Sequence, residues 1–329
     1  MTIRISLVLF FIFTTQLCFS QPMRILFIGN SYTHYNNMPL LFEKMAKSKG
    51  IKLEVTADAK SNHSFKMHAE RKELFETINS QKWDYVILQG FSRELAQDTK
   101  IIDSLTLPFA KQILDSIYAS NKCANVLLYQ TWGYKNGYLI DSISPKWDYQ
   151  TMSDRVHSGY LYLSKKLSLS VVPVGKVWEL IKENHPEINL YQADNQHPSI
   201  AGSYLAAASF YAAIFKTNPN SSYYSNLDSI TATKIQELTG AYVLMNKNRY
   251  ELNKNTIEIS ITKNAKNKQE IKCIANYPNA KSCTWDFGEG NTQKGFTAKH
   301  SCGEIKKHHI LIKIEDSCGT RIIKRIVMP

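Results

Sequence analysis

The sequence predicts a doubly wound α/β domain followed by a small antiparallel β-sandwich. From residue 23 to about residue 215, short apolar runs rich in β-branched residues alternate with amphipathic stretches of helical length. Continuously apolar strands separated by helices are typical of a parallel sheet that is covered on both faces. After Tyr250 the helical period disappears, and short strands separated by turns follow.

The α/β part is predicted to alternate strand and helix along the chain. Its strands are the apolar runs at residues 24–29, 53–58, 84–89, 125–130 and 170–175. Helices are predicted between them at residues 39–49, 65–80, 107–120 and 151–167. A last helix at 199–215 repeats apolar residues at helical spacing, and residues 222–247 are predicted to add one or two helices.

The β-sandwich is predicted from runs of strand length with no helical period. These runs are residues 255–263, 269–277, 283–290, 308–316 and 320–328. We therefore expect three parts: a signal peptide at 1–20, the α/β domain at 21–250 and the β-sandwich at 251–329.

The first twenty residues read as a secretory signal. Arg4 precedes an apolar run at residues 5–13, and the small residues Cys18 and Ser20 stand at the −3 and −1 positions. This pattern predicts cleavage after Ser20 and a secreted or periplasmic protein. No later segment reaches the roughly 18 apolar residues of a membrane span, so none is expected.

The charge of the chain is basic, at +12 over 329 residues. A basic surface suits acidic polymers such as uronic-acid polysaccharides or nucleic acid, whereas scattered lysines suit an ordinary solvated surface. Here the lysines are scattered, which favours an ordinary surface. An acidic polysaccharide remains the alternative partner. Phosphodiester or nucleic-acid chemistry ranks last, because no metal-binding constellation accompanies the charge.

The cysteines are expected to reflect export, which permits disulfides. Cys123, which precedes an apolar strand, is expected to be a buried free thiol. Four cysteines allow three pairings, and the sequence does not choose among them. These four lie in the C-terminal part: Cys273, Cys283, Cys302 and Cys318.

One serine stands where an open α/β sheet collects its functional groups. The segment "GNSYT" places Ser31 beyond the carboxyl end of the first strand and at a helix start, where backbone N–H groups favour negative charge. The segment "DNQHPS" supplies Asp194 and His197 in a loop before the last core helix. At this spacing the carboxylate is expected to hold the imidazole Nδ1–H and leave Nε2 free to activate the serine. The sequence therefore predicts a nucleophile, a base and its orienting acid.

The same edge of the predicted sheet offers hydrogen-bond donors for an oxyanion. We expect one donor from the Ser31 backbone, one from the loop after the second strand, and the side-chain amide of Gln89 at the end of the third. Each motif alone also fits a helix N-cap or a turn. Their arrival at one edge of the sheet favours catalysis.

These motifs resemble the SGNH (GDSL-like) hydrolase superfamily. "FIGNSYT", "YVILQ" and "DNQHPSIAGSY" are similar to its blocks, above all in a bacterial subgroup with I-G-N-S-[FY]-T and L-Q, over about residues 23–216. The resemblance implies a flavodoxin-like three-layer fold and ester hydrolysis through an acyl-serine, with Gln89 in place of the oxyanion asparagine. Where the family has glycine after the second strand, this chain has Ser61 and Asn62, which we expect to complete the oxyanion hole in a more crowded pocket.

The substrate side of the site is predicted from its neighbours along the chain. Asn30, Trp132 and His68 are predicted to bind substrate. Trp132 with Tyr134 either flanks a sugar ring or packs beneath a loop, and His68 either lines the cleft or lies on a helix surface. No motif calls for a metal or another cofactor, so none is predicted.

The segment "TWDFGEG" in the C-terminal part resembles the signature of PKD-type immunoglobulin-like domains. Physically it reads as a core tryptophan leading into a turn that glycine permits. The resemblance implies a spacer or a module that contacts polymers.

The predicted function is an exported serine esterase for small acyl esters, above all O-acetyl groups on carbohydrate. Export, the β-sandwich and the aromatic residues near the site favour sugars, and the chain has no long apolar segment to serve as a lipase lid. The alternative is a catalytically weak or inactive surface protein that binds polysaccharide, which the altered block at Ser61 and Asn62 suggests.

Overall fold

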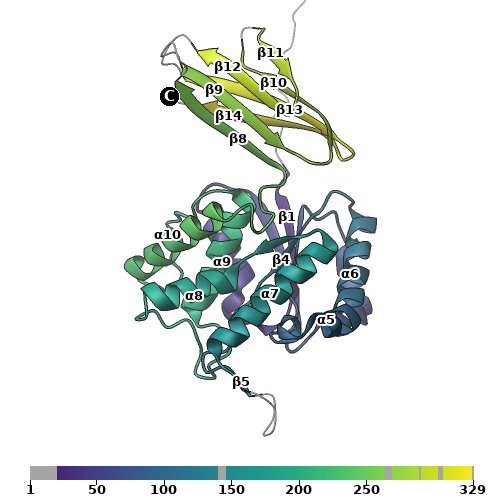
Figure 1. Ribbon diagram of the computed structural model, residues 1–329, viewed down its shortest axis with the longest axis vertical. Helices are drawn as coiled ribbons and strands as arrows, with labels where there is room; N and C mark the ends of the chain where they lie inside the picture. The colour runs from purple at the N-terminus through teal and green to yellow at the C-terminus, as the bar shows by residue number, and fades with distance from the viewer. Residues whose placement is uncertain (1–20, 140–145, 264–268, 289, 303–306, 328–329) are drawn as a thin grey trace, which may run out of the picture.

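A computed structural model describes residues 21–139, 146–263, 269–288, 290–302 and 307–327 of the chain. The predicted signal peptide, residues 1–20, lies outside the described residues. Figure 1 shows an α/β part and, stacked on one end of it, a β-sandwich.

The centre of the α/β part is a parallel sheet in the order β2-β1-β3-β4-β7. Counted along the chain, the order is 2-1-3-4-5, which is that of flavodoxin-like folds. Each strand overlaps one of the five predicted apolar runs, so the predicted fold class is confirmed. Their bounds are β1 (Met23–Gly29), β2 (Leu53–Ala59), β3 (Tyr85–Leu88), β4 (Asn125–Tyr129) and β7 (Ser170–Val172).

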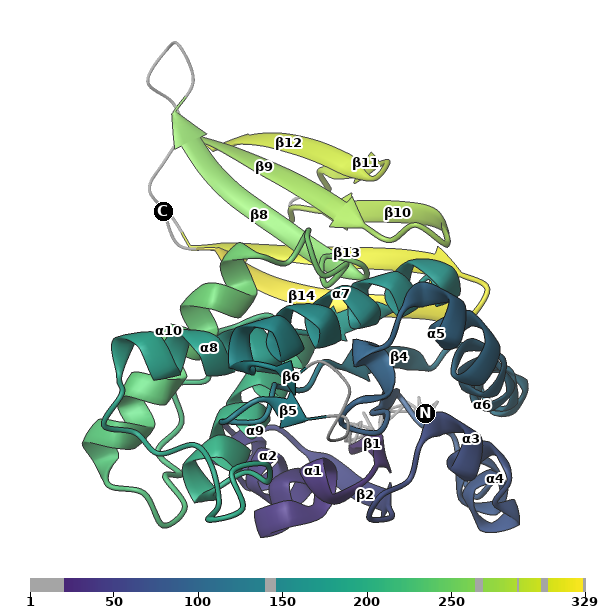
Figure 2. The same cartoon turned by 60° about the horizontal axis from the view of Figure 1, so that its bottom comes forward.

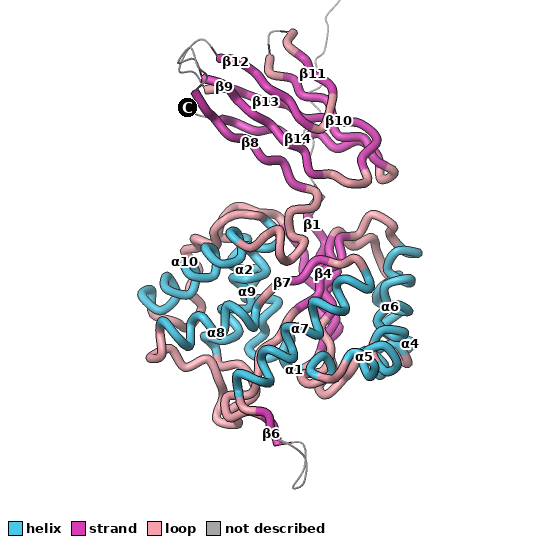
Figure 3. Tube along the Cα trace, viewed as in Figure 1, coloured by secondary structure: helices cyan, strands magenta, loops and turns pink. Residues whose placement is uncertain are grey.

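Helices cover both faces of this sheet and complete three layers, as Figure 3 shows. On one side α9 contacts α2, α8 and α10, and on the other α6 contacts α4 and α7. None of the helices in the described part has the length and apolarity to cross a membrane. The bounds are α2 (Met38–Lys47), α4 (Lys72–Asn79), α6 (Leu107–Ser120), α7 (Tyr149–Leu167), α8 (Val174–Asn184), α9 (Ile200–Phe215) and α10 (Ser229–Met245).

Helix α9 differs from the one-faced helix that its spacing predicted. Residues 201–214 are all buried, because neighbouring helices enclose it on several sides. A helix that is apolar all round is a buried helix. Its alanines and glycine keep it narrow; a Cβ on Gly202 would lie 2.4 Å from the carbonyl oxygen of Leu190.

Several short elements were not predicted. The helix expected at 65–80 divides into α3 (Phe65–Ala69) and α4, because Arg71 between them adopts an extended backbone. The strand expected to reach residue 175 stops at Val172, before Pro173, and α8 starts at Val174. The other short elements are α1 (Ser31–His34), η1 (Tyr35–Asn37), η2 (Glu94–Ala96), α5 (Thr99–Leu105), β5 (Tyr138–Leu139) and β6 (Lys146–Trp147).

The C-terminal part is an antiparallel sandwich of two sheets, in the orders β11-β10-β13-β14 and β12-β9-β8. Trp285 is fully buried in its core, and the indole N–H donates to the carbonyl of Gly295 at 2.8 Å. The predicted all-β class is confirmed, whereas β11 and β12 were not predicted. The strands are β8 (Thr256–Lys263), β9 (Gln269–Asn276), β10 (Ala280–Asp286), β11 (Thr292–Lys294), β12 (Thr297–Cys302), β13 (His308–Asp316) and β14 (Gly319–Val327).

The sandwich meets the α/β part at the amino ends of the parallel strands. Cys123, two residues before β4, forms a disulfide with Cys318 in the turn between β13 and β14. Beside it the Asn255 amide donates to the Asn125 side chain at 3.1 Å. In Figure 2 the opposite end of the α/β part, with β5 and β6, comes forward. The sandwich therefore lies away from the carboxyl ends of the strands, where the site was predicted.

The disulfide corrects the expectation for Cys123, which is not a free thiol. Its partner is Cys318, with the two Cα atoms 5.7 Å apart, and Cys273 and Cys283 are buried free thiols. The side chain of Cys302 lies outside the described residues. Cysteine positions in a sequence do not reveal how two domains dock, and here the docking brings Cys123 to Cys318.

Replacing Cys318 with serine is expected to lower the free energy of unfolding by about 2–5 kcal/mol, because the bond closes a long loop across the two parts. Urea unfolding with and without reductant measures this. Reductant should lower the free energy of unfolding of the wild-type protein and leave that of the variant unchanged. Non-reducing peptide mapping that pairs Cys318 with a cysteine other than Cys123 would contradict the assignment.

Candidate active site

The nucleophile candidate, Ser31, is the first residue of helix α1, and one residue, Asn30, separates it from the end of the buried strand β1. Asn30 caps this helix, since its side-chain oxygen accepts from the Tyr32 N–H at 3.1 Å. As the first helical residue, Ser31 has a backbone N–H without an acceptor inside the helix. The turn thus presents a hydroxyl and a free donor on the same residue.

The three residues predicted from two distant segments lie together. Ser31 Oγ is 2.9 Å from His197 Nε2, and His197 Nδ1 is 2.5 Å from Asp194 Oδ2. Because the carboxylate can only accept, the imidazole donates through Nδ1 and offers Nε2 as an acceptor to the serine hydroxyl. This is the geometry that a serine nucleophile requires.

The Asp194 carboxylate is kept ionised by its surroundings. Burial raises its pKa, but hydrogen bonds from the His197 side chain and from the N–H groups of Gln196 and His197 outweigh burial and lower the pKa below its usual value. The other oxygen, Oδ1, accepts both of those backbone N–H groups at 2.9 Å. The backbone of the loop therefore fixes the orientation of the carboxylate independently of the imidazole.

A clamp joins the nucleophile segment to the histidine loop. The Asn36 amide donates to the carbonyls of Pro198 and Ser199 at 2.9 and 3.0 Å, and lies 2.9 Å from the Ser203 hydroxyl. Asn36 adopts a left-handed backbone with φ 51°, which asparagine tolerates better than most residues. These contacts fix the backbone directly after His197 and so help to hold its side chain in place.

Gln89 does not take the position predicted for an oxyanion donor. Its side chain is fully buried, Oε1 accepts from the Asn30 N–H at 3.0 Å and the Thr33 hydroxyl at 2.8 Å, and the NH₂ donates to the Gly90 carbonyl. A Cβ on Gly29 would lie 2.7 Å from Gln89 Oε1. Gln89 therefore stabilises the turn that contains Ser31 through hydrogen bonds to Asn30 and Thr33. It does not line the pocket.

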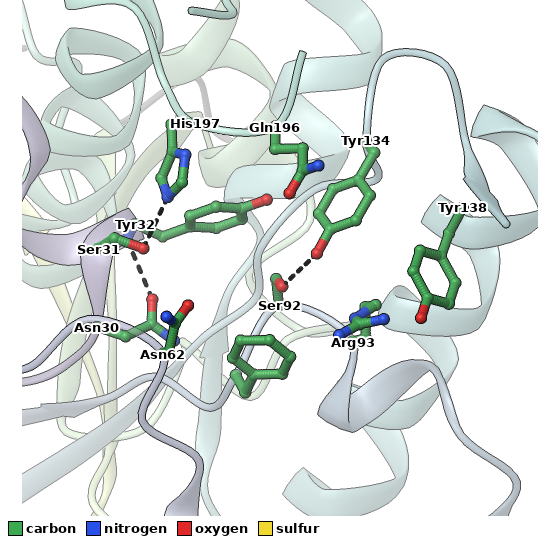
Figure 4. Close-up of a pocket in the computed structure, with 11 residues that line it drawn as sticks. Asn30, Ser31, Tyr32, Asn62, Ser92, Arg93, Tyr134, Tyr138, Gln196 and His197 are labelled. Carbon is green, nitrogen blue, oxygen red and sulfur yellow. Dashed lines mark hydrogen bonds between the residues drawn. The ribbon is translucent and has the colours of Figure 1, made fainter. Parts of the chain in front are cut away.

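The loop after β2 separates the other two oxyanion candidates. The Ser61 hydroxyl lies 2.9 Å from His34 Nε2 on the exposed side of the loop. Asn62 has a left-handed backbone with φ 61° and lines the pocket, where Figure 4 shows its side chain below Ser31. Of this pair, only Asn62 stands where it can meet a substrate.

The structure corrects two predicted substrate-binding residues. His68 is fully buried and donates from Nε2 to the Gly29 carbonyl at 2.9 Å, and burial lowers its pKa to about 4. Trp132 is also fully buried, and its ring stacks between Tyr32 and Trp178 with centroids at 4.4 and 3.9 Å. Both support the site from behind, and the third predicted residue, Asn30, does line the pocket.

The pocket beside Ser31 has a volume of about 250 Å³. Besides the predicted residues it is lined by side chains that sequence reasoning missed: Phe91, Ser92, Arg93, Tyr138 and Gln196. Phe91, Ser92 and Arg93 follow the end of strand β3, after Gln89 and Gly90. Their place at the carboxyl edge of the sheet could have identified them as pocket residues from the sequence. Figure 4 shows Tyr134 across the pocket, with its hydroxyl 2.7 Å from that of Ser92.

No protein-family model and no curated protein matches the chain. Among solved structures it is similar to a DUF4886 family protein from Bacteroides uniformis, at 16% identity, 68% of this chain, 95% of that chain and a TM-score of 0.57. This likeness shows the fold. Weaker likenesses are to a protein assigned as an SGNH hydrolase from Slackia heliotrinireducens (24% identity, 58% of this chain, 97% of that chain, TM-score 0.47) and to the acetyl xylan esterase AlAXEase (16%, 58%, 100%, 0.45).

Proposed function

We propose that the protein is an exported serine esterase that removes small acyl groups, acetyl above all, from carbohydrate. The observation that carries the proposal is the hydrogen-bonded row from Ser31 through His197 to Asp194, with distances of 2.9 and 2.5 Å. A serine with an activating base and an orienting acid supports acyl transfer.

In this mechanism His197 Nε2 accepts the hydroxyl proton of Ser31 as Oγ attacks the ester carbonyl carbon. The oxyanion that forms is stabilised by the Ser31 backbone N–H and by the amide of Asn62. Collapse breaks the bond to the alcohol, which leaves with the proton from His197. Water then attacks the acyl-serine with the same base and releases the acid.

The size and lining of the pocket support a small acyl ester on a sugar. Its volume of about 250 Å³ lies just below the usual range for pockets that hold drug-sized ligands. Phe91, Tyr134 and Tyr138 supply aromatic surface in the lining, which suits the apolar face of a sugar ring. The export signal predicted from the sequence would agree with a substrate outside the cytoplasm.

Labelling with a fluorophosphonate probe tests the proposal. The native protein should gain one adduct, and peptide mapping should place it on Ser31, because only an activated serine attacks such a probe. Heat-denatured protein serves as the control and should remain unlabelled. A native protein that takes no label would favour the alternative, an inactive surface protein that binds polysaccharide.

A further inference from the structure

The pocket contains an arginine that the proposed mechanism does not use. Arg93 follows strand β3, immediately before η2, and lines the same pocket as Ser31 and His197. In Figure 4 it lies next to Tyr138, on the side of the pocket away from His197. It therefore lies at the end of the pocket opposite the histidine (Figure 4).

The Arg93 guanidinium is held by aromatic rings rather than by an acid. Its Cζ lies 4.2 Å from the ring centroid of Tyr138 and 5.3 Å from that of Phe91. Its Nε is buried without a hydrogen-bond partner. Within the described residues four other arginines form ion pairs with carboxylates, and Arg93 forms none; the four are Arg24, Arg71, Arg155 and Arg321.

The acidic residue nearest to Arg93 in the sequence, Glu94, forms its hydrogen bonds with backbone N–H groups. The Glu94 carboxylate accepts from the Phe91 N–H at 2.9 Å and from the Phe65 N–H at 3.2 Å. Among the described residues, none of those that line the pocket is an aspartate or glutamate, and Asp194 lies behind His197. Within the described part of the chain, the pocket lining thus carries the positive charge of Arg93 and no carboxylate.

We propose that Arg93 binds a carboxylate on the substrate, so that the acyl ester is carried by an acidic sugar, a uronic acid residue. The planar fork of a guanidinium matches a carboxylate with two parallel hydrogen bonds. A partly buried charge attracts its partner more strongly than one in open water. The neutral Ser92–Tyr134 hydroxyl pair then remains available for the sugar hydroxyls. This inference rests on the proposed esterase function.

The test compares two substrates that differ only in the carboxylate: the mono-O-acetates of methyl glucuronoside and methyl glucoside. Wild type should show a kcat/KM about 10- to 100-fold higher for the acid, which is the range of a charge-assisted hydrogen bond. In Arg93→Gln this ratio should fall to about one, mainly through KM. Free glucuronate should inhibit wild-type hydrolysis of an aryl acetate better than glucose does.

A matched control is Arg155→Gln. Arg155 also lies over an aromatic ring, with Cζ 4.6 Å from the Trp147 centroid, but it pairs with Asp98 at 2.6 Å and lies outside the pocket lining. This variant should keep the substrate ratio. Equal rates for the two sugar acetates in wild type would overturn the role of Arg93 and leave the esterase intact. A protein that takes no phosphonate label and hydrolyses no ester would overturn both.

Discussion

Ser31→Ala is expected to reduce kcat/KM for 4-nitrophenyl acetate by about 10⁴- to 10⁶-fold, the range for removing the nucleophile of a serine hydrolase. The loss is large because His197 then has no hydroxyl to activate, although the pocket still binds the ester. The lost hydroxyl contacts His197 at 2.9 Å and is already largely buried, so the smaller side chain fits without strain. Initial rates across substrate concentrations measure the effect.

The control for this prediction is Ser104→Ala. Ser104 is an exposed serine of helix α5, and its hydroxyl donates to the Lys100 carbonyl at 3.0 Å, away from the pocket. It should retain the wild-type rate. Both variants should keep the wild-type circular dichroism spectrum and unfolding temperature. Full turnover by a folded Ser31→Ala protein would exclude Ser31 from the mechanism.

The sheet could be predicted because burial on both faces leaves a direct trace in the sequence. A central strand such as β1 must be apolar at successive positions, and Ile25 to Ile28 are each at most 1% exposed. The parallel order then brings the carboxyl ends of the strands to one edge. That geometry is why Ser31 and His197, 166 residues apart, could be expected to meet.

The orientation of individual side chains could not be predicted in the same way. Gln89, Trp132 and His68 all lie near the expected edge, but each points into the protein. For Trp132 the reason is packing, since Tyr32 and Trp178 enclose its ring at stacking distance. For Gln89 it is hydrogen bonding, since its amide satisfies the backbone of the nucleophile turn. Rotamers of this kind depend on neighbours that lie far away in the sequence.

Asp194→Asn is expected to lower kcat for the aryl acetate by about 10³- to 10⁴-fold at neutral pH, in line with such changes in other serine hydrolases. An asparagine can offer its NH₂ to His197 Nδ1, which favours the tautomer that carries the proton on Nε2. That tautomer cannot accept the proton of Ser31. The wild-type carboxylate does not lose its role through titration near neutrality, because its pKa is lowered from 3.8.

Asp228→Asn separates this effect from a simple loss of loop structure. Asp228 also accepts the backbone N–H three residues ahead, from Thr231 at 2.9 Å, but it caps helix α10 far from the pocket. It should leave kcat unchanged, whereas Asp194→Asn should lose activity and still fold. Because the lowered pKa of Asp194 favours the folded state only above that pKa, any stability that Asp194→Asn loses at neutral pH should diminish as the pH falls below about 4. A variant at Asp194 with wild-type kcat would mean that His197 is oriented by the Asn36 clamp and not by the acid.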